Sequence, residues 1–273
     1  MPELPEVETV CRGLSASIAG SRIVSVKLRR ADLRVPFSPG FAKAVEGAAI
    51  TTITRRAKYL IFTLDNGQSI LAHLGMSGRF SVIPGIPKSY EKHDHVVWTL
   101  DDGRAVIYSD PRRFGIMLHV KTARIHEHPL LSHLGPEPFS KEFTAGYLKQ
   151  QLLRRKGPVK PAIMNQQLVV GVGNIYASEA LFLSGIDPRK PAHEAASKAV
   201  LLVKSIRKVL SDAIASGGSS LKDFVHISGE TGYFQHHFNV YEREGEPCIS
   251  CNNELVATRQ AGRSTFYCAT CQG

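Results

Sequence analysis

The chain begins Met1-Pro2-Glu3-Leu4-Pro5-Glu6, and a stripe of apolar residues follows at once. The stripe has the spacing of one helix face and consists of Val7, Val10, Cys11, Leu14 and Ile18. Two prolines precede it, and proline is tolerated in the first turn of a helix. The pattern predicts an amphipathic helix over residues 6–19 that packs on a domain and holds the chain start against it.

The first residues also carry chemistry. Removal of Met1, which is common before a small residue, leaves the secondary amine of Pro2 as the chain start. An α-amino group titrates at about pH 8, so a fraction is unprotonated at neutral pH and can form a Schiff base with a carbonyl carbon. The carboxylate of Glu3 is placed to move protons there. On these residues alone, the alternative is a frayed terminus without function.

Size and charge restrict the classes of protein to consider. At 273 residues, two domains are expected. Lys and Arg total 34 against 24 Asp and Glu, a net charge of +10 that favours nucleic acid over membrane as a partner, with a solvated basic surface as the alternative. The sequence has no run of apolar residues of membrane-spanning length and no secretion signal, so we expect a cytoplasmic protein.

Residues 23–120 have the two-residue periodicity of strands. Asp65-Asn66-Gly67 and Asp101-Asp102-Gly103 each separate two β-rich runs and predict hairpins. The expected strands are 23–28, 50–54, 58–64, 69–74, 79–83, 96–100, 104–109 and 115–120. With the leading helix, these about eight strands predict a β-sandwich or barrel-like domain that ends near residue 130.

Beyond residue 132 the periodicity becomes helical. Leu134-Gly135-Pro136-Glu137-Pro138 is typical of an interdomain linker. The predicted helices are 141–155, 160–167, 174–184 and 192–215, and Gly217-Gly218 should end the last. Residues 217–233 are expected to form a long mobile loop.

Four of the five cysteines form two CxxC pairs near the C-terminus. These are Cys248, Cys251, Cys268 and Cys271. In a reducing cytosol such pairs bind zinc rather than forming disulfides, and four sulfur ligands leave no open position for catalysis. We therefore expect one structural Zn²⁺ per chain, with the basic residues 259–265 at the tip of a hairpin that suits a DNA backbone. Cys11 is expected to be a buried apolar residue.

Weaker patterns also suit a polyanion. Gly171-Val172-Gly173-Asn174 precedes a helix, so Asn174 could be its N-cap at a phosphate site, although an ordinary helix–turn–helix is an equal alternative. Arg55-Arg56-Ala57-Lys58 puts cations at a strand end, where a solvated end is the alternative. Asp110-Pro111-Arg112-Arg113-Phe114 combines arginine with an aromatic ring, which suits phosphate contact and insertion into a base stack.

Two further segments are considered for sites. His73-Leu74-Gly75-Met76-Ser77 ends a strand in a glycine turn that could present Met76 outward. His93-Asp94-His95 lacks a third ligand at a supporting spacing, so we expect phosphate contact or structural hydrogen bonding there rather than metal.

In combination these motifs resemble the bacterial formamidopyrimidine-DNA glycosylases, over essentially the whole chain. The matching segments are MPELPEVETV (1–10), RRAKYL (55–60), HLGMSG (73–78), KHDH (92–95), DPRRFG (110–115), LGPEP (134–138), VVGVGNIYASEALF (169–182), GGSS (217–220) and AGRSTFYCATC (261–271). The resemblance implies an enzyme that excises oxidised purines, 8-oxoguanine and formamidopyrimidines, from duplex DNA and then cleaves the abasic site by β- and δ-elimination.

The resemblance also implies the roles of individual residues. Pro2 would attack C1′ of the damaged nucleotide, and Glu3 would donate and shuttle protons. Lys58 would be the proton donor in β-elimination, and Arg263 would grip phosphates and serve δ-elimination. The implied DNA contacts are His73, His93, Arg112, Arg155, Lys160, Asn174 and Tyr241. Met76, Arg112 and Phe114 would fill the void left by the extruded nucleotide, with Arg112 reading the opposite cytosine.

The expected fold is α+β. It comprises an N-terminal catalytic β-sandwich with a leading helix (1–132), a linker (133–138), an all-helical helix–two-turn–helix domain (139–235) that the resemblance implies, and a C-terminal zinc-finger β-hairpin (236–273). The loop after Gly217 would cover the flipped base. Damaged double-stranded DNA is the expected partner of a monomer that acts at the bacterial nucleoid, without a membrane or a nucleotide cofactor.

Two alternatives stay open. An endonuclease VIII-like glycosylase would prefer oxidised pyrimidines, but Met76 together with Arg112 and Phe114, and the Pro-Glu-Leu-Pro start, favours the purine enzyme. A zinc-ribbon DNA-binding protein without catalysis would use the hairpin but not Pro2 or Glu3.

Overall fold

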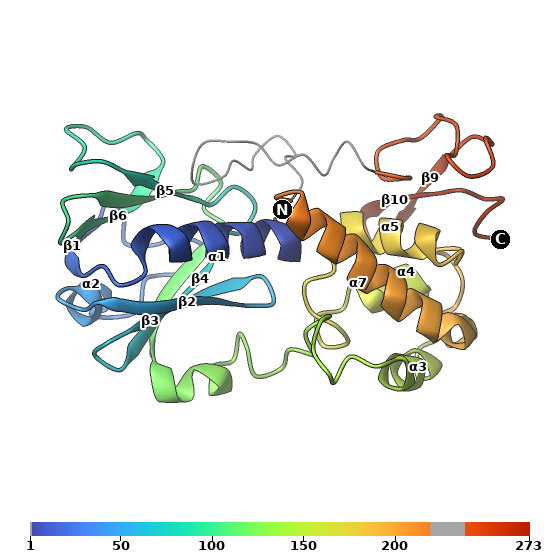
Figure 1. The fold of residues 1–273 in the computed structure, drawn as a ribbon, viewed down its shortest axis with the longest axis horizontal. Helices are drawn as coiled ribbons and strands as arrows, with labels where there is room; N and C mark the ends of the chain where they lie inside the picture. Colours follow the sequence, from blue (N-terminus) through green and yellow to red (C-terminus); the bar gives the residue numbers. More distant parts are fainter. Residues whose placement is uncertain (1, 219–237) are drawn as a thin grey trace. The chain divides into compact units, whose positions relative to one another are not determined.

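The computed structural model describes residues 2–218 and 238–273, which form two compact units (Figure 1). The first unit contains residues 2–132 with Gly217 and Gly218, and the second contains residues 133–216 and 238–273. Most of the loop expected at 217–233, and its covering role, lies outside the described residues. Within the described part of the chain, no helix has the length and apolar character needed to cross a membrane.

The leading helix α1 (Leu4–Ile18) begins earlier than the apolar stripe alone predicts. Glu3 is its N-cap, and Glu6 Oε2 accepts a hydrogen bond from the backbone N–H of Glu3 at 2.8 Å. The Glu3 carboxylate faces the backbone of Glu6 in return, which is the reciprocal arrangement of a capping box. The helix therefore begins two residues earlier than predicted, and Pro5 lies in its first turn.

Two four-stranded antiparallel sheets follow. One has the order β2-β3-β4-β8, formed by Ile50–Arg56, Tyr59–Leu64, Gln68–His73 and Ile116–Lys121. The other has the order β1-β6-β7-β5, formed by Ile23–Leu28, Asp94–Leu100, Ala105–Ser109 and Arg79–Ile83. This architecture confirms the predicted β-sandwich with a leading helix.

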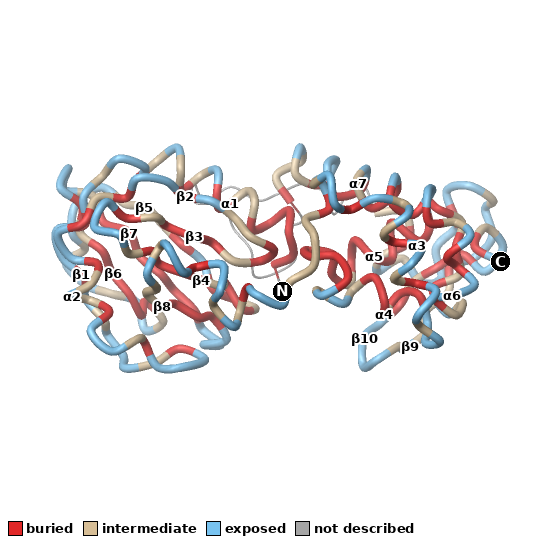
Figure 2. Tube along the Cα trace, turned by 90° about the horizontal axis from the view of Figure 1, so that it is seen from below, coloured by how far each residue is buried: buried red, intermediate tan, exposed pale blue. Residues whose placement is uncertain are grey.

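The core of the first unit lies between the sheets and beneath α1. The rings of Phe62 and Trp98 meet edge to face with centroids 5.3 Å apart, and Phe80 packs on Tyr108 at 5.0 Å. Figure 2 shows buried residues along the strands and along the inner side of α1. Cys11 is part of this core, as predicted, and its thiol donates to the carbonyl oxygen of Ile53 at 3.6 Å.

The strand register brings several chain segments to one end of the sandwich. In the first sheet Tyr59 pairs with His73, and His73 pairs with Ile116. In the second sheet Ser109 pairs with both Arg79 and Asp94. The β2–β3 turn, the β4–β5 turn, the β7–β8 loop and the start of β6 therefore meet at this end, which we call the rim (residues 57–58, 74–78, 93 and 110–115).

Two short elements escaped the sequence analysis. They are α2 (Phe41–Val45) and the 3₁₀ helix η1 (Thr122–Glu127). Elements of five or six residues contain too few positions for a helical periodicity to stand out.

The second unit is built on helices. They are α3 (Ala145–Leu153), α4 (Val159–Ile163), α5 (Asn174–Leu183), α6 (Ala192–Ala195) and α7 (Ala199–Ala215). The single helix expected at 192–215 is divided by the 3₁₀ turn η2 (Ala196–Lys198). The helix expected at 160–167 ends at Ile163, because the Asn165 side chain accepts from the Gln167 N–H at 2.9 Å and stabilises a turn instead.

The chain closes with the hairpin β9 (Val256–Gln260) and β10 (Arg263–Tyr267). Its turn residues, Ala261 and Gly262, both have positive φ, 48° and 76°, as a type I′ turn requires. The fold thus has the helical and hairpin parts that the sequence predicts after the β-sandwich.

A buried carboxylate joins helix α5 to residues 239–241, the segment that precedes the hairpin. Glu179 lies in α5 and is fully buried. Its oxygens accept from the backbone N–H groups of Asn239, Val240 and Tyr241 at 2.9, 3.0 and 2.9 Å, and from the Asn239 side chain at 2.7 Å. A buried charge needs such donors to offset its desolvation, so this contact fixes residues 239–241 on α5.

Replacing Glu179 by Ala should destabilise the second unit, because it leaves one buried and three part-buried donors without their acceptor. We expect the free energy of unfolding to fall by roughly 3 kcal/mol, measured by urea unfolding. Glu194→Ala is the matched control, since that side chain is 53% exposed, and it should change stability by less than about 0.5 kcal/mol. Equal midpoints for the two variants would contradict this role.

Candidate functional site

An ion pair holds α1 against the turn that carries Lys58. Arg55 Nε donates to Glu8 Oε2 at 2.8 Å, and Arg55 Nη1 donates to the carbonyl oxygen of Ala57 at 2.8 Å. Burial alone would raise the pKa of Glu8, but hydrogen bonds and charge from Arg55 and Arg12 hold it below its usual value. The charged pair therefore joins α1 to the residue before Lys58, and Arg55 is not part of a solvated strand end.

The chain start is enclosed on this helix. Pro2 is buried, and Glu3 and Lys58 are only 4% and 7% exposed. Because α1 packs on β2 and β3, the structure places Pro2 and Glu3 on an element that adjoins the turn of Lys58. Gly218 returns to the same helix. With φ at +81°, its backbone lies so close that an added Cβ would be 3.2 Å from Glu6 Oε1.

His73 lies at the end of β4, next to this group. Its ring stacks obliquely on Tyr59 with centroids 4.9 Å apart, and its Nδ1 accepts the Gly75 N–H at 2.9 Å. Burial lowers the pKa of His73 to about 4, and the charges of Lys58 and Arg34 act in the same direction. The imidazole is therefore neutral at pH 7 and carries its proton on Nε2, which suits donation to an anion.

The rim presents the three residues expected to fill a void in DNA. Met76 is half-buried in the β4–β5 turn, whereas Arg112 and Phe114 are exposed in the β7–β8 loop. The Arg112 guanidinium lies over the Phe114 ring, 5.1 Å from its centroid, and Phe114 is 43% exposed. An exposed aromatic ring under an arginine is a surface feature suited to stacking with a base.

The histidines before β6 support this loop. His95 Nε2 lies 2.9 Å from the carbonyl oxygen of Asp110, and His93 O accepts the Asp110 N–H at 3.0 Å. Burial lowers the pKa of His95, so its neutral ring donates to that carbonyl. Structural hydrogen bonding, one of the two roles expected here, is therefore what His95 provides, while His93 is half-buried at the rim.

A second group of expected site residues lies in the second unit. Asn174 Nδ2 donates to the Ser264 carbonyl oxygen at 3.0 Å and to Tyr241 Oη at 3.4 Å. The prediction that Asn174 is the N-cap of α5 is wrong: Gly173 is the N-cap, and Asn174 is the first helical residue. Its side chain is instead engaged by the β-hairpin and by Lys160.

Lys160 belongs to the same group. It is 1% exposed, and its ammonium donates to Asn174 Oδ1, Ser264 O and Thr265 Oγ1 at 2.8, 2.9 and 2.8 Å. An ammonium has three N–H donors, so these acceptors engage all of them. Lys160 therefore holds Asn174 and the first residues of β10 together.

The remaining predicted residues of this unit are more exposed. Arg263 is exposed and flanks the hairpin turn opposite Gln260. Arg155 is half-buried, and its guanidinium donates to the backbone and side chain of Gln151 in α3 rather than to the Asn174 group. The structure thus brings Lys160, Asn174, Tyr241 and the strand that begins at Arg263 together, and it holds Arg155 on α3.

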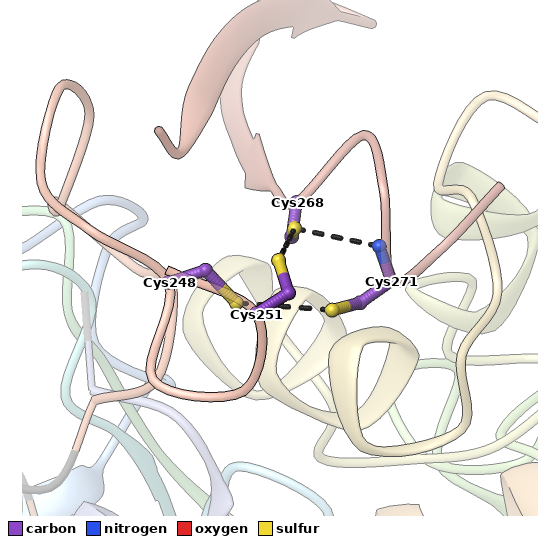
Figure 3. A group of neighbouring side chains, drawn as sticks. All are labelled: Cys248, Cys251, Cys268 and Cys271. Carbon is purple, nitrogen blue, oxygen red and sulfur yellow. Dashed lines mark hydrogen bonds between the residues drawn. The ribbon is translucent and has the colours of Figure 1, made fainter. Parts of the chain in front are cut away.

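The four C-terminal cysteines form a metal site (Figure 3). Their sulfurs all lie within 4.8 Å of one another, with Cys248 and Cys271 3.9 Å apart and Cys251 and Cys268 3.5 Å apart. A tetrahedron of Zn–S bonds of about 2.3 Å separates its sulfurs by about 3.8 Å. The cluster of four sulfurs therefore fits one zinc ion, and Gln272 Oε1 accepts the Cys268 N–H beside it at 2.8 Å.

Several residues that organise the site were missed by the sequence analysis. Glu179, Asp110 and Ser77 are buried polar groups whose partners lie far away in sequence. Glu179 had a signal, since it is the only charged residue in the helix Asn174–Leu183. Ser77 and Asp110 had one too, because each lies in a glycine-containing motif where a small polar residue commonly organises a turn.

Three successive segments of the chain match known protein families. Residues 1–117 match the formamidopyrimidine-DNA glycosylase N-terminal domain, residues 134–225 match the H2TH domain of the same family, and residues 245–273 match a zinc finger found in FPG and IleRS. The chain belongs to the formamidopyrimidine-DNA glycosylase family. The zinc finger match and the cysteine geometry agree on one structural zinc ion.

Relatives and structures of this family cover nearly the full chain. A formamidopyrimidine-DNA glycosylase from Ruegeria sp. (strain TM1040) is 48% identical, with 100% of both chains covered. A structure of MutM in complex with carbocyclic 8-oxo-G containing DNA has a TM-score of 0.90 at 36% identity, covering 99% of both chains. The Lactococcus lactis Fpg in complex with an abasic site containing DNA has a TM-score of 0.91 at 34% identity, again covering 99% of both chains.

Removing the zinc should unfold the C-terminal hairpin and leave the β-sandwich intact, because each unit has its own core. Cys268→Ser, or chelation of the wild type, should abolish stoichiometric zinc by elemental analysis and collapse the NMR dispersion of residues 245–273. Cys11→Ala is the control, since Cys11 lies in the sandwich core, and it should retain one zinc per chain. A dispersed hairpin in metal-free protein would contradict a structural metal.

The half-buried His73 should make stability depend on pH, because its pKa is lowered in the folded state. The unfolded imidazole takes a proton near pH 6.5, whereas the folded one resists until about pH 4. Stability should therefore be full above pH 6.5 and fall as the pH drops towards 4. His73→Asn keeps an acceptor for the Gly75 N–H. In urea unfolding between pH 4 and 6.5, it should reduce the slope of the unfolding free energy against pH by the equivalent of up to one proton. Tyr59→Phe is the control and should leave that slope unchanged. Identical slopes for His73→Asn and wild type would refute the buried neutral state.

Proposed function

We propose that this chain is a bifunctional DNA glycosylase and abasic-site lyase that removes oxidised purines from duplex DNA. The observation that carries the proposal is the enclosure of Pro2 and Glu3 on α1, beside the turn of Lys58, in a member of the formamidopyrimidine-DNA glycosylase family. The partner is damaged double-stranded DNA, bound by a monomer in the cytoplasm at the nucleoid. The net charge of +10 supports binding to a polyanion.

The first step is base release. After removal of Met1, the Pro2 nitrogen attacks C1′ of the damaged nucleotide, and the bond from C1′ to the base breaks. The electron pair leaves with the purine, which gains a proton. The Pro2 nitrogen then loses its proton, Glu3 moves a proton to the ring oxygen so that the C1′–O4′ bond breaks, and the Pro2 nitrogen and C1′ become an iminium ion. Enclosure of both residues supports this role, because a nucleophile and its acid must be held in one geometry.

The next steps cleave the backbone. Loss of a C2′ proton expels the 3′ phosphate, and loss of a C4′ proton then expels the 5′ phosphate, so the product is a one-nucleoside gap. Lys58 serves the β-elimination as proton donor, and Arg263 serves the δ-elimination by gripping a phosphate. The attachment of the Lys58 turn to α1 through Arg55 and Glu8 supports its place beside the nucleophile.

Phosphate binding is divided between the two units. In the first, the neutral His73 offers Nε2–H, and His93 and Arg112 lie at the rim. In the second, Asn174, Tyr241, Arg155 and Arg263 supply amide, hydroxyl and guanidinium donors, all of which suit phosphate oxygens. Lys160 acts indirectly, by orienting the Asn174 amide.

Extraction of the damaged base leaves a void in the duplex. Unstacking costs a few kcal/mol, and side chains that enter the void offset part of that cost. Met76 and Phe114 are the apolar wedges, and Arg112 presents donors to the acceptors of the opposite cytosine. The exposure of Phe114 beneath the Arg112 guanidinium supports this assignment.

The decisive test is borohydride trapping on a duplex that carries 8-oxoguanine opposite cytosine. We expect a covalent cross-link on Pro2 by mass spectrometry of the linked peptide, because borohydride reduces the iminium ion. Pro2→Gly and Glu3→Gln should each lower single-turnover excision by about a hundredfold or more. Both variants should remain folded, as judged by circular dichroism.

Three outcomes separate the alternatives. Preferential trapping on an oxidised pyrimidine would indicate the endonuclease VIII-like specificity. Tight lesion binding with no cross-link, in protein whose intact mass shows that Met1 is absent, would indicate a non-catalytic DNA-binding protein. Full excision by both variants would refute the assignment of Pro2 and Glu3.

A further inference from the structure

Asp110 begins the β7–β8 loop and is fully buried. Its Oδ1 accepts the hydroxyl proton of Ser77 at 2.6 Å, and its Oδ2 accepts the Gly115 N–H at 2.8 Å and faces Tyr108 Oη at 3.4 Å. The carboxylate therefore closes its own loop from the first residue to the last. It also reaches the neighbouring β4–β5 turn through Ser77.

The Ser77 hydroxyl both donates and accepts a hydrogen bond. It donates to Asp110, and its oxygen accepts the backbone N–H of Arg112 at 3.0 Å. Ser77 directly follows Met76, so one hydroxyl connects the turn that carries Met76 with the backbone of Arg112. Both hydrogen bonds of this hydroxyl are buried or half-buried, which strengthens them relative to exposed ones.

The two loops also meet backbone to backbone. A Cβ added at Gly75, whose φ is +63°, would overlap the backbone of Phe114 and Gly115. Cβ atoms added at Gly78 or Gly115 would each overlap the Tyr108 hydroxyl. Glycine at these positions lets the loops approach until the Ser77–Asp110 hydrogen bond can form.

The backbone of Asp110 is fixed as well. Its N–H donates to His93 O, and its carbonyl oxygen accepts from His95 Nε2. Asp110 is thus held by residues before and within β6. The side-chain connection from the turn of Met76 to Asp110 and to the Arg112 backbone runs through the Ser77 hydroxyl.

We propose that Ser77 and Asp110 form a latch that sets the spacing between Met76 and the Arg112–Phe114 pair, and thereby determines discrimination for the base opposite the lesion. The inference rests on the proposed function, in which those three side chains enter the void. Both latch residues are buried, so both are positioning residues. Recognition of one base over another depends on the angle and distance of Arg112 donors, whereas filling a void tolerates small displacements.

The test is single-turnover excision of 8-oxoguanine opposite cytosine and opposite adenine. Ser77→Ala should lower the ratio of the two rates by about tenfold to a hundredfold, mainly through slower excision opposite cytosine. Ser77→Thr, which keeps the hydroxyl, should restore most of the ratio. In an Arg112→Ala background, Ser77→Ala should change the ratio no further, because the residue that it positions is gone.

Ser109→Ala is the matched control. The Ser109 hydroxyl donates to Asp94 in the same sandwich and is similarly buried, but it does not join the two loops. It should lower the melting temperature comparably and leave the ratio unchanged. If Ser77→Ala and Ser109→Ala have equal ratios, the latch is refuted.

Trapping at Pro2 separates failure of the latch from failure of the proposed function. An unchanged ratio with normal Pro2 cross-linking in all variants would overturn the latch alone. Absence of a Pro2 cross-link in the wild type would overturn the proposed function first. Should Ser77→Ala fail to fold, Asp110→Asn provides the second measurement of the ratio and should also lower it, because an amide offers only one acceptor oxygen for the two donors, Ser77 and Gly115.

Discussion

The attachment of α1 to β2 is the constraint on which the site depends. A nucleophile at a chain terminus is useful only if the terminus is held, because the first residues of most domains fray. Here the capping box fixes the start of the helix, and the Glu8–Arg55 ion pair fixes the helix to the sheet. Arg55 then reaches the carbonyl oxygen of Ala57, so the same interaction positions Lys58. One half-buried ion pair thus arranges the terminus and the lysine together.

The strand register of the sandwich is a second constraint, because it fixes where the turns of the rim lie. Its sheets are rigid, and the turns at one end inherit their positions from paired strands, as is common for functional loops on β scaffolds. The rim residues are further joined by buried polar groups, among which Asp110 has several partners. The exposed side chains Arg112 and Phe114 therefore stand on a loop whose backbone is immobilised from several directions.

In the second unit, the hairpin that carries Arg263 is also held in place, although few apolar residues pack around it. Zinc replaces a core there, since four sulfurs and a few apolar residues close the structure. Two buried charges join the hairpin and its neighbouring segment to the helices: Lys160 reaches β10, and Glu179 reaches residues 239–241. Such fully bonded buried charges specify one arrangement, because any shift leaves a charge without partners.

Features that depend on local spacing could be predicted from the sequence. Hairpin turns, the amphipathic face of α1, the CxxC pairs and the ordered family motifs are each encoded within a few residues, and together they sufficed for the fold class, the zinc ion and the family. Which polar groups are buried became known only from the folded chain. Lys160 lies inside, Asn174 is not an N-cap, and Ser77 meets Asp110 from 33 residues away, because such contacts form only when packing brings distant segments together.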